Sequence, residues 1–221
     1  MKPCSEISHP FGDVSEKYPL YFITDPLYGD PLIAVRQALR GGVKLVQYRD
    51  KLASRRQVYE TALHIREVTR AYDATLIIND DVDIAMAVGA DGVHLGQEDF
   101  PLLEARRLLG TAIIGVSTHD LDEARQAESE GADYIGVGPV FTTSTKTTRL
   151  PIGLSTLEGV ARHIKIPLYA IGGIGFKDIP DILATGATGI AAISGLSGPI
   201  EENVTQWLTA LRCGNKAGDR G

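Results

Sequence analysis

Charged residues recur directly after short apolar runs along this chain. The letters QYRDK occupy residues 47–51, Asp80 follows a second apolar run, and Asp99 follows a third. Two carboxylates that leave other coordination positions to water or phosphate oxygens match the preference of Mg²⁺. We therefore expect Asp80 and Asp99 to bind one Mg²⁺ between them. The alternative is that each merely caps the helix after it, a role that Asp81 and Asp83 fit better.

Three cationic residues accompany these acids. Arg49 and Lys51 lie on one loop, and Lys146 lies in a hydroxyl-rich stretch. The planar guanidinium of arginine and the compact ammonium of lysine suit different phosphate oxygens. Cations that face a carboxylate-bound Mg²⁺ predict a diphosphate site, and ordinary surface salt bridges are the alternative. We assign the whole 47–51 segment to substrate binding: Gln47, Tyr48, Arg49, Asp50 and Lys51.

Glycines at the ends of two later apolar runs indicate a second anion site. Gly172 and Gly173 end one run, and Ser194 and Gly195 end the next. Glycine allows the backbone N–H groups to approach a phosphate closely. Tight turns are the alternative for each pair taken alone. Two separate anion sites would suit an enzyme that joins two phosphorylated substrates.

Two histidines lie in or after apolar runs. His119 follows the run 113–117, so it is either a general-base candidate or a residue that orients its loop. His94 lies inside the run 92–95, where a core role fits better. We leave the role of His119 open.

Eight short, mostly continuous apolar runs must carry these residues. Such runs are typical of strands buried on both faces of a parallel sheet. We predict strands at residues 20–24, 43–48, 75–78, 92–95, 113–117, 134–137, 168–171 and 189–193. Between them lie amphipathic helical stretches at 55–72, 121–130, 157–164, 179–185 and 204–211.

Strict alternation of strand and helix predicts an α/β fold with parallel strands and right-handed crossovers. Eight near-equal units favour a single (β/α)8 TIM barrel over an open doubly wound sheet. We expect the barrel to span residues 18–213, after an extension at 1–17 and before a mobile tail at 214–221. Functional residues of such a barrel lie at the carboxyl ends of its strands.

The composition of the chain indicates which classes of molecule it is expected to bind. The formal net charge of −6 argues against a nucleic-acid or membrane-surface partner, each of which favours a basic face. The N-terminal segment does not resemble a secretory signal, and Cys4 and Cys213 are expected to be free thiols. We therefore predict a cytoplasmic protein that acts on small molecules, and a homo-oligomer is one possibility.

The motifs taken together resemble the thiamine-phosphate synthase family between about Tyr21 and Ser194. The segments that carry this resemblance are 21–25, 47–51, 78–80, 89–99, 115–119, 136–141, 142–146 and 170–174. The resemblance implies a transferase that joins 4-amino-2-methyl-5-hydroxymethylpyrimidine diphosphate to a thiazole phosphate and releases pyrophosphate. It implies Mg²⁺ at Asp80 and Asp99. It also implies that the thiazole nitrogen captures a pyrimidine methylene cation, so that no strong protein base is required.

Carried over residue by residue, the resemblance assigns two groups of ligands. The pyrimidine diphosphate would be held by Gln47, Arg49, Lys51, Asn79, Ser117 and Lys146. The thiazole phosphate would be held by Thr143, Ser144, Thr145, Gly173, Ile193 and Ser194. The catalytic candidates among these residues are Arg49, Lys51, Ser117 and Lys146, and residues 142–146 are the candidate lid.

Two departures and three alternative functions remain. Asp81 stands where the family often has arginine, and Thr147-Thr148 stand where it often has lysine and aspartate. A thiazole tautomerase would use a histidine such as His119, but it would lack Lys51 and Asp80. A non-catalytic phosphate-binding barrel should have lost a charged strand-end residue. A phosphate-binding isomerase would not require two anion sites.

Overall fold

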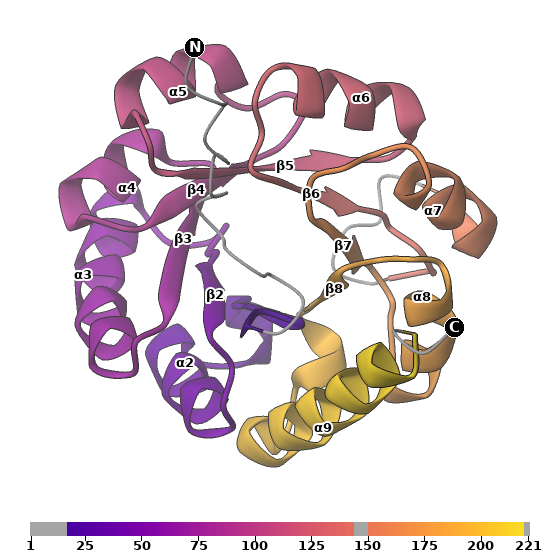
Figure 1. Cartoon of the computed structure of the whole chain (residues 1–221). Coiled ribbons are helices and arrows are strands. Elements are labelled where there is room, and N and C mark those ends of the chain that lie inside the picture. The colour runs from indigo at the N-terminus through magenta and orange to yellow at the C-terminus, as the bar shows by residue number, and fades with distance from the viewer. Residues whose placement is uncertain (1–16, 144–149, 219–221) are drawn as a thin grey trace, which may run out of the picture.

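The computed structural model describes residues 17–143 and 150–218, and it shows a closed barrel of parallel strands. The strands are β1 Leu20–Ile23, β2 Leu45–Tyr48, β3 Thr75–Asn79, β4 Gly92–Leu95, β5 Ile113–Thr118, β6 Tyr134–Val137, β7 Leu168–Ile171 and β8 Gly189–Ala192. Each strand pairs with its neighbours in chain order, and β1 also pairs with β8 (Figure 1). The predicted (β/α)8 barrel is therefore confirmed, because an open sheet would leave two edges unpaired.

Helices alternate with the strands and form a ring around them (Figure 1). The α-helices are α2 Pro31–Arg40, α3 Arg55–Ala71, α4 Val82–Val88, α5 Leu102–Leu109, α6 Leu121–Ser129, α7 Gly153–Ala161, α8 Ile179–Ala184 and α9 Ile200–Gly218. Short 3-10 helices lie at η1 Pro26–Tyr28, η2 Phe176–Asp178 and η3 Ser194–Leu196. The ring covers the outer face of the barrel, as its continuous apolar strands require.

The helix boundaries follow local signals in the sequence. Ser54 and Gln57 form a capping box at the start of α3, and Gly89 ends α4 in the left-handed conformation with φ of 61°. The prediction is less accurate where such signals are weak. α7 begins at Gly153 rather than 157, and α9 runs from Ile200 to Gly218, beyond both ends of the predicted helix 204–211.

Three tyrosines fill the barrel interior. Tyr21, Tyr134 and Tyr169 come from β1, β6 and β7, and each is almost completely buried. Their rings meet edge to face, with centroids 5.4 Å apart for Tyr21 and Tyr169 and 5.7 Å apart for the other two pairs. This arrangement is favourable for aromatic rings, so the three side chains form a packed floor beneath the carboxyl ends of the strands.

Two ion pairs tie helices to the amino-terminal ends of the strands. Asp133, in the loop before β6, accepts hydrogen bonds from the Ile114 N–H at 2.7 Å and from Arg106 Nη2 at 2.6 Å. Asp91, in the loop before β4, is bound in the same way by the Leu76 N–H at 2.7 Å and by Arg66. Both loops contain the sequence Gly-Ala-Asp, so the same short motif makes equivalent contacts at two places in the barrel.

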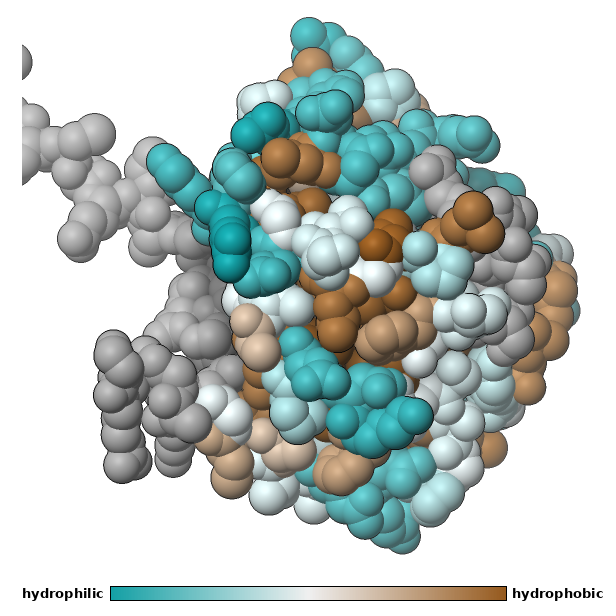
Figure 2. Space-filling model, turned by 90° about the vertical axis from the view of Figure 1, so that its right-hand side faces the viewer, coloured by the Kyte–Doolittle hydropathy of each residue, from teal (hydrophilic) through white to brown (hydrophobic). Residues whose placement is uncertain are grey.

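The outer surface is mixed in polarity. Figure 2 shows the side of the molecule that α7 and α8 form, where hydrophilic side chains surround a smaller hydrophobic area. Hydrophobic residues in the described helices gather instead on the faces toward the strands, as Val58, Ala62 and Ile65 of α3 do. Across the described ranges, none of the helices has the length and apolar character needed to cross a membrane.

Candidate active site

A pocket lies at the carboxyl ends of the barrel strands, where barrels of this kind carry their active sites. Strand ends and the loops after them line it, so residues far apart in the sequence meet there. Ten of the predicted site residues contribute to the lining: Gln47, Arg49, Lys51, Asp80, Asp99, Ser117, Thr143, Gly173, Ile193 and Ser194.

Two carboxylates converge at the ends of β3 and β4. Asp80 has φ of 60°, a left-handed conformation that aspartate tolerates better than most residues. The Asp99 carboxylate accepts a hydrogen bond from the Gly96 N–H at 2.8 Å, and a Cβ at Gly96 would lie only 2.6 Å from that oxygen. Burial, together with the neighbouring Asp80 carboxylate, raises the pKa of Asp99. The two acids are therefore held close together although their charges repel.

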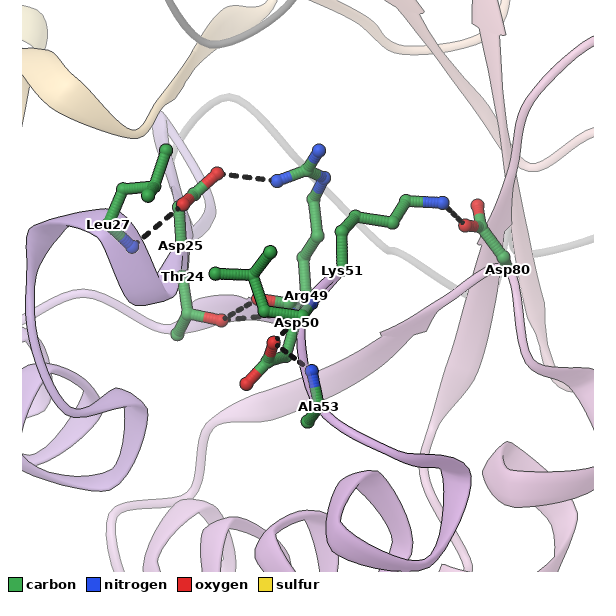
Figure 3. Close-up of polar contacts among 9 residues, drawn as sticks. Thr24, Asp25, Leu27, Arg49, Asp50, Lys51, Ala53 and Asp80 are labelled. Carbon is green, nitrogen blue, oxygen red and sulfur yellow. Dashed lines mark hydrogen bonds and ion pairs between the residues drawn. The ribbon is translucent and has the colours of Figure 1, made fainter.

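Each of two cations in the pocket is paired with a carboxylate (Figure 3). The Lys51 ammonium reaches across to Asp80. Arg49 Nη1 donates to Asp25 Oδ2 at 2.5 Å, and Asp25 is itself oriented by the Leu27 N–H at 3.0 Å. Asp25 follows β1 and is nearly buried, so it restricts where the arginine can point. The pocket therefore contains ordered cations beside its acidic pair.

Side-chain alternation divides the 47–51 segment. Gln47, Arg49 and Lys51 line the pocket, but Tyr48 packs in the layer between strands and helices. Asp50 points to the other side and accepts hydrogen bonds from the N–H groups of Leu52 and Ala53, both at 2.9 Å (Figure 3). Successive residues of an extended chain face opposite sides, so every second residue of this segment lines the pocket.

Asn79 is the third predicted binding residue that does not belong to the pocket lining. It ends β3, is partly exposed, and its carbonyl accepts a hydrogen bond from the Asp81 N–H at 2.7 Å. Alternation accounts for this position too, because the next residue, Asp80, is the one that lines the pocket. The binding roles of Tyr48, Asp50 and Asn79 stay predictions without a pocket contact to support them.

Glycine backbone forms the opposite side of the pocket. Gly172 and Gly173 have φ of 97° and 68°, and a Cβ at Gly173 would lie 2.4 Å from the Thr142 carbonyl oxygen. No side chain fits there without a shift of the backbone. Ile193 and Ser194 lie beside this turn at the end of β8. Backbone groups and a hydroxyl therefore face the acids and cations across the pocket.

Part of the predicted loop lies outside the described residues. Thr143 lines the pocket, whereas Ser144, Thr145 and Lys146 belong to the segment 144–149, which the structure does not describe. The candidate lid 142–146 falls largely on the same segment. Its role stays a prediction.

Both histidines that the sequence singled out line the pocket. His94 is buried at its floor and stacks on Tyr134, with ring centroids 5.5 Å apart. Its Nδ1 lies 3.0 Å from the Tyr134 hydroxyl and its Nε2 lies 2.9 Å from Ser117 Oγ. His119 Nδ1 lies 2.6 Å from Glu123 Oε2, which also accepts from the His119 N–H. The Glu123 carboxylate therefore orients the His119 ring.

The expected helix cap at α4 is wrong in part. Asp81 occupies the N-cap position but makes no capping hydrogen bond with its side chain. It pairs instead with Arg55 Nη1 at 2.6 Å, and Arg55 Nη2 pairs with Asp83 at 2.5 Å. Arg55 is exposed, but it is not simply solvated as its place on α3 suggests. The departure at Asp81 is thus accommodated by an arginine on the neighbouring helix.

Two residues that the sequence does not assign to the site contribute to it: His94 lines the pocket, and Asp25 pairs with the pocket residue Arg49. Asp25 lies two residues after the end of β1, so a search of the residues that follow every strand would have found it. His94 lies within an apolar run, and nothing in the sequence shows which way it points. Its contact with Ser117 depends on the pairing of β4 with β5.

Comparison with known proteins agrees with this geometry. Residues 20–196 match the family model described as thiamine monophosphate synthase. The thiamine-phosphate synthase of Chloroflexus aurantiacus is 51% identical over 161 residues, which cover 72% of this chain and 74% of that protein. The thiamine-phosphate synthase of Pyrococcus furiosus is 44% identical over 200 residues, which cover 90% of this chain and 96% of that protein.

A solved structure extends the likeness to three dimensions. The thiamine phosphate pyrophosphorylase from Pyrococcus furiosus superposes with a TM-score of 0.84 at 40% sequence identity. The superposition covers 90% of this chain and 98% of that chain. The strand-end acids, cations and glycines lie within the matched residues, and the chain therefore belongs to the thiamine-phosphate synthase family.

Proposed function

We propose that this barrel transfers the 4-amino-2-methyl-5-pyrimidinylmethyl group from its diphosphate to 4-methyl-5-(2-phosphooxyethyl)thiazole and releases pyrophosphate. The observation that carries the proposal is the two-sided pocket. Acids and cations at the ends of β2 to β4 face glycine backbone at the ends of β7 and β8. Membership of the thiamine-phosphate synthase family supports the same reaction.

The acid and cation side suits the pyrimidine diphosphate. Arg49 and Lys51 carry positive charge into the pocket and can pair with diphosphate oxygens. Gln47 and Ser117 lie deeper and offer an amide and a hydroxyl to the pyrimidine ring. Lys146 and Asn79 complete the proposed set, as the family resemblance implies.

Asp80 and Asp99 fit a divalent cation. Their donor set contains only oxygen. Burial and the neighbouring Asp80 carboxylate raise the pKa of Asp99, and a cation between the two acids would relieve their repulsion. Over residues 17–143 and 150–218, no cluster of three or more His, Cys, Asp or Glu side chains is arranged to hold a metal ion. Substrate phosphates and water would therefore supply the remaining ligands. Bound Mg²⁺ would offset the negative charge that develops on the departing pyrophosphate.

The glycine side suits the thiazole phosphate. Gly173 exposes its backbone to the pocket because the turn admits no side chain there. Ser194 and Thr143 add hydroxyl groups, and Ile193 adds an apolar surface for the ring. Ser144 and Thr145 belong to the same proposed set by resemblance. This half would bring the thiazole nitrogen to the pyrimidine methylene carbon.

The chemistry requires positioning more than proton transfer. The carbon–oxygen bond to pyrophosphate breaks, pyrophosphate keeps the electron pair, and the thiazole nitrogen donates a pair to form the new carbon–nitrogen bond. Cations stabilise the leaving group, and the pocket holds the two reactants in contact. Water must be excluded, because it would otherwise capture the methylene carbon. We propose residues 142–146 as the lid that completes this exclusion.

One reaction mixture tests the proposed function. The protein is incubated with both substrates and Mg²⁺, and thiamine phosphate and pyrophosphate are measured by chromatography. We expect the two products in equal amounts, and excess chelator should abolish both. Pyrophosphate without thiamine phosphate would contradict the transfer, and full activity in chelator would contradict the metal assignment. The cytoplasmic location and a possible homo-oligomer stay predictions.

A further inference from the structure

A chain of hydrogen bonds runs beneath the pocket from one side of the barrel to the other. Gln47 Nε2 donates to the Tyr21 hydroxyl at 2.7 Å, and that hydroxyl lies 2.7 Å from the Tyr134 hydroxyl. Tyr134 continues to His94 Nδ1 at 3.0 Å, and His94 Nε2 ends the chain at Ser117 Oγ, 2.9 Å away. The two ends, Gln47 and Ser117, are pocket residues.

The linking groups are shielded from water. Tyr21 and Tyr134 are almost completely buried, and His94 is 8% exposed. Burial raises the pKa of both phenols far above the ordinary value, so each keeps one proton to donate. Buried polar groups of this kind must satisfy one another, because an unmatched donor or acceptor is costly.

The direction of donation follows from the Gln47 end. Gln47 gives an N–H to the Tyr21 oxygen, so the Tyr21 proton can pass to Tyr134, and the Tyr134 proton can pass to His94 Nδ1. His94 then carries its proton on Nε2 and donates to Ser117. The Ser117 hydroxyl proton is left to point to the pocket, and the Gln47 carbonyl oxygen is left to accept. Donation in the reverse direction, from Ser117 towards Gln47, would require the Gln47 side-chain amide to flip, so that its oxygen instead of its nitrogen faced Tyr21.

We propose that Tyr21, Tyr134 and His94 are positioning residues that fix which hydrogen-bonding groups Gln47 and Ser117 present to the pyrimidine ring. In the direction described, the pocket offers a carbonyl acceptor on one side and a hydroxyl donor on the other. A 4-aminopyrimidine has the matching pattern, because its exocyclic amine donates and its ring nitrogens accept. A 4-oxopyrimidine places an acceptor where the amine would donate. The preference for the aminopyrimidine ring, which rests on the proposed function, is thus set by Tyr21 and Tyr134 beneath the pocket and by His94 at its floor.

The tautomer of His94 tests this hydrogen-bond chain without any substrate. In the ¹⁵N-labelled protein, ring nitrogen chemical shifts distinguish a protonated from an unprotonated nitrogen, and the spectrum of His94→Gln assigns the His94 signals. We expect a neutral ring with the proton on Nε2 in the wild type. We expect a mixture of tautomers in Tyr134→Phe, because that change removes the hydroxyl that faces Nδ1. A proton on Nδ1, or a charged ring, in the wild type would overturn the proposal.

Binding of two diphosphates tests the consequence for specificity. The 4-amino and 4-oxo pyrimidinylmethyl diphosphates are titrated by calorimetry with Mg²⁺ present and the thiazole phosphate absent. Tyr134→Phe should lower the preference for the amino compound about tenfold, because a mispaired buried hydrogen bond no longer penalises the oxo compound. His94→Gln should lower it by a similar factor.

Tyr169→Phe is the matched control. Tyr169 belongs to the same buried ring cluster, but its hydroxyl donates to the Tyr18 carbonyl at 3.0 Å and takes no part in the chain. The Tyr169→Phe variant also loses one buried hydroxyl, yet it should keep the wild-type preference for the amino compound over the oxo compound. If Tyr169→Phe lost the preference to the same extent, or if Tyr134→Phe did not lose it, the hydrogen-bond chain would have a merely structural role. If the wild type bound neither diphosphate, the proposed function would fail, while the tautomer result would still decide the hydrogen-bond chain.

Discussion

Charge pairing organises the pocket at the scale of single residues. Lys51 pairs with Asp80 and remains half exposed, whereas Arg49 pairs with the nearly buried Asp25 and is largely shielded from solvent. Asp99 lies beside Asp80 with a raised pKa that burial and its neighbour cause. The arrangement holds opposite charges ready for an anionic substrate and a cation to enter together.

Replacing Asp80 by asparagine should remove the proposed metal site without unfolding the barrel. Asparagine tolerates the left-handed backbone at this position, which alanine would strain. We expect kcat/KM to fall about a hundredfold or more, because one of two metal carboxylates is lost. Steady-state kinetics at several Mg²⁺ concentrations would measure the loss. Asp83→Asn is the control: Asp83 is exposed on α4, and wild-type kinetics are expected.

Replacing Arg49 by lysine should weaken binding of the pyrimidine diphosphate although the charge is kept. Lysine lacks the planar fork that can contact Asp25 and a phosphate at once. We expect KM for this substrate to rise about tenfold and KM for the thiazole phosphate to stay the same. Arg56→Lys, on the exposed face of α3, should change neither constant. Equal increases in both KM values would argue against the assignment of Arg49 to the diphosphate.

At the scale of elements, strand alternation decides which residues reach the pocket. Gln47 at the end of β2 faces the barrel interior, whereas Tyr48 packs against the helices. The amino-terminal ends of the strands serve a different purpose. There Asp133 binds both the backbone of β5 and Arg106 of α5, which ties a helix to the barrel.

Replacing Asp133 by alanine should destabilise the fold and leave the active site unchanged. The substitution leaves the Ile114 N–H without its acceptor and removes the carboxylate partner of the partly buried Arg106. We expect the free energy of unfolding to fall by about 2–4 kcal/mol, measured by urea denaturation. Glu104→Ala breaks an exposed pair with Arg107 and should cost less than about 1 kcal/mol. A large loss of activity in folded Asp133→Ala would contradict the separation of stability from catalysis.

At the scale of the whole molecule, the barrel is held together by tyrosines that must stay neutral. Burial raises the pKa of Tyr48 to about 12 and raises those of Tyr21, Tyr134 and Tyr169 well above the ordinary value. In the unfolded chain these groups ionise near 10, the ordinary value for tyrosine. The unfolded state therefore loses protons first as pH rises, and the fold loses stability.

Alkaline pH should consequently unfold the protein in a defined range. The contribution of Tyr48 is complete below pH 10 and is lost between pH 10 and about 12. The three interior tyrosines, whose pKa values are also raised, add to the loss above pH 10. Each should contribute a slope of about 1.4 kcal/mol per pH unit in that range. Urea unfolding at a series of pH values would measure it. Tyr48→Phe should reduce the slope, and an unchanged slope would exclude Tyr48 as a contributor.

Local patterns in the sequence determined the barrel architecture. Continuous apolar runs predicted β1 to β8, because strands buried on both faces need no polar alternation. Polar residues at the ends of those runs and in the loops after them identified the acids and cations that line the pocket, since parallel strands bring their carboxyl ends to one side. The weak signals at the start of α7 and the ends of α9 left those boundaries inaccurate.

Only the tertiary structure decided which neighbours act together. The chain from Gln47 to Ser117 joins residues of β1, β2, β4, β5 and β6, and it exists because the closed barrel brings their interior faces together. Sequence shows Tyr21, His94 and Tyr134 only as members of apolar runs, with no sign of their direction. Local propensity therefore determined strands, helices and strand-end chemistry, whereas closure of the sheet determined the partners, because those contacts span distances in sequence that no local pattern records.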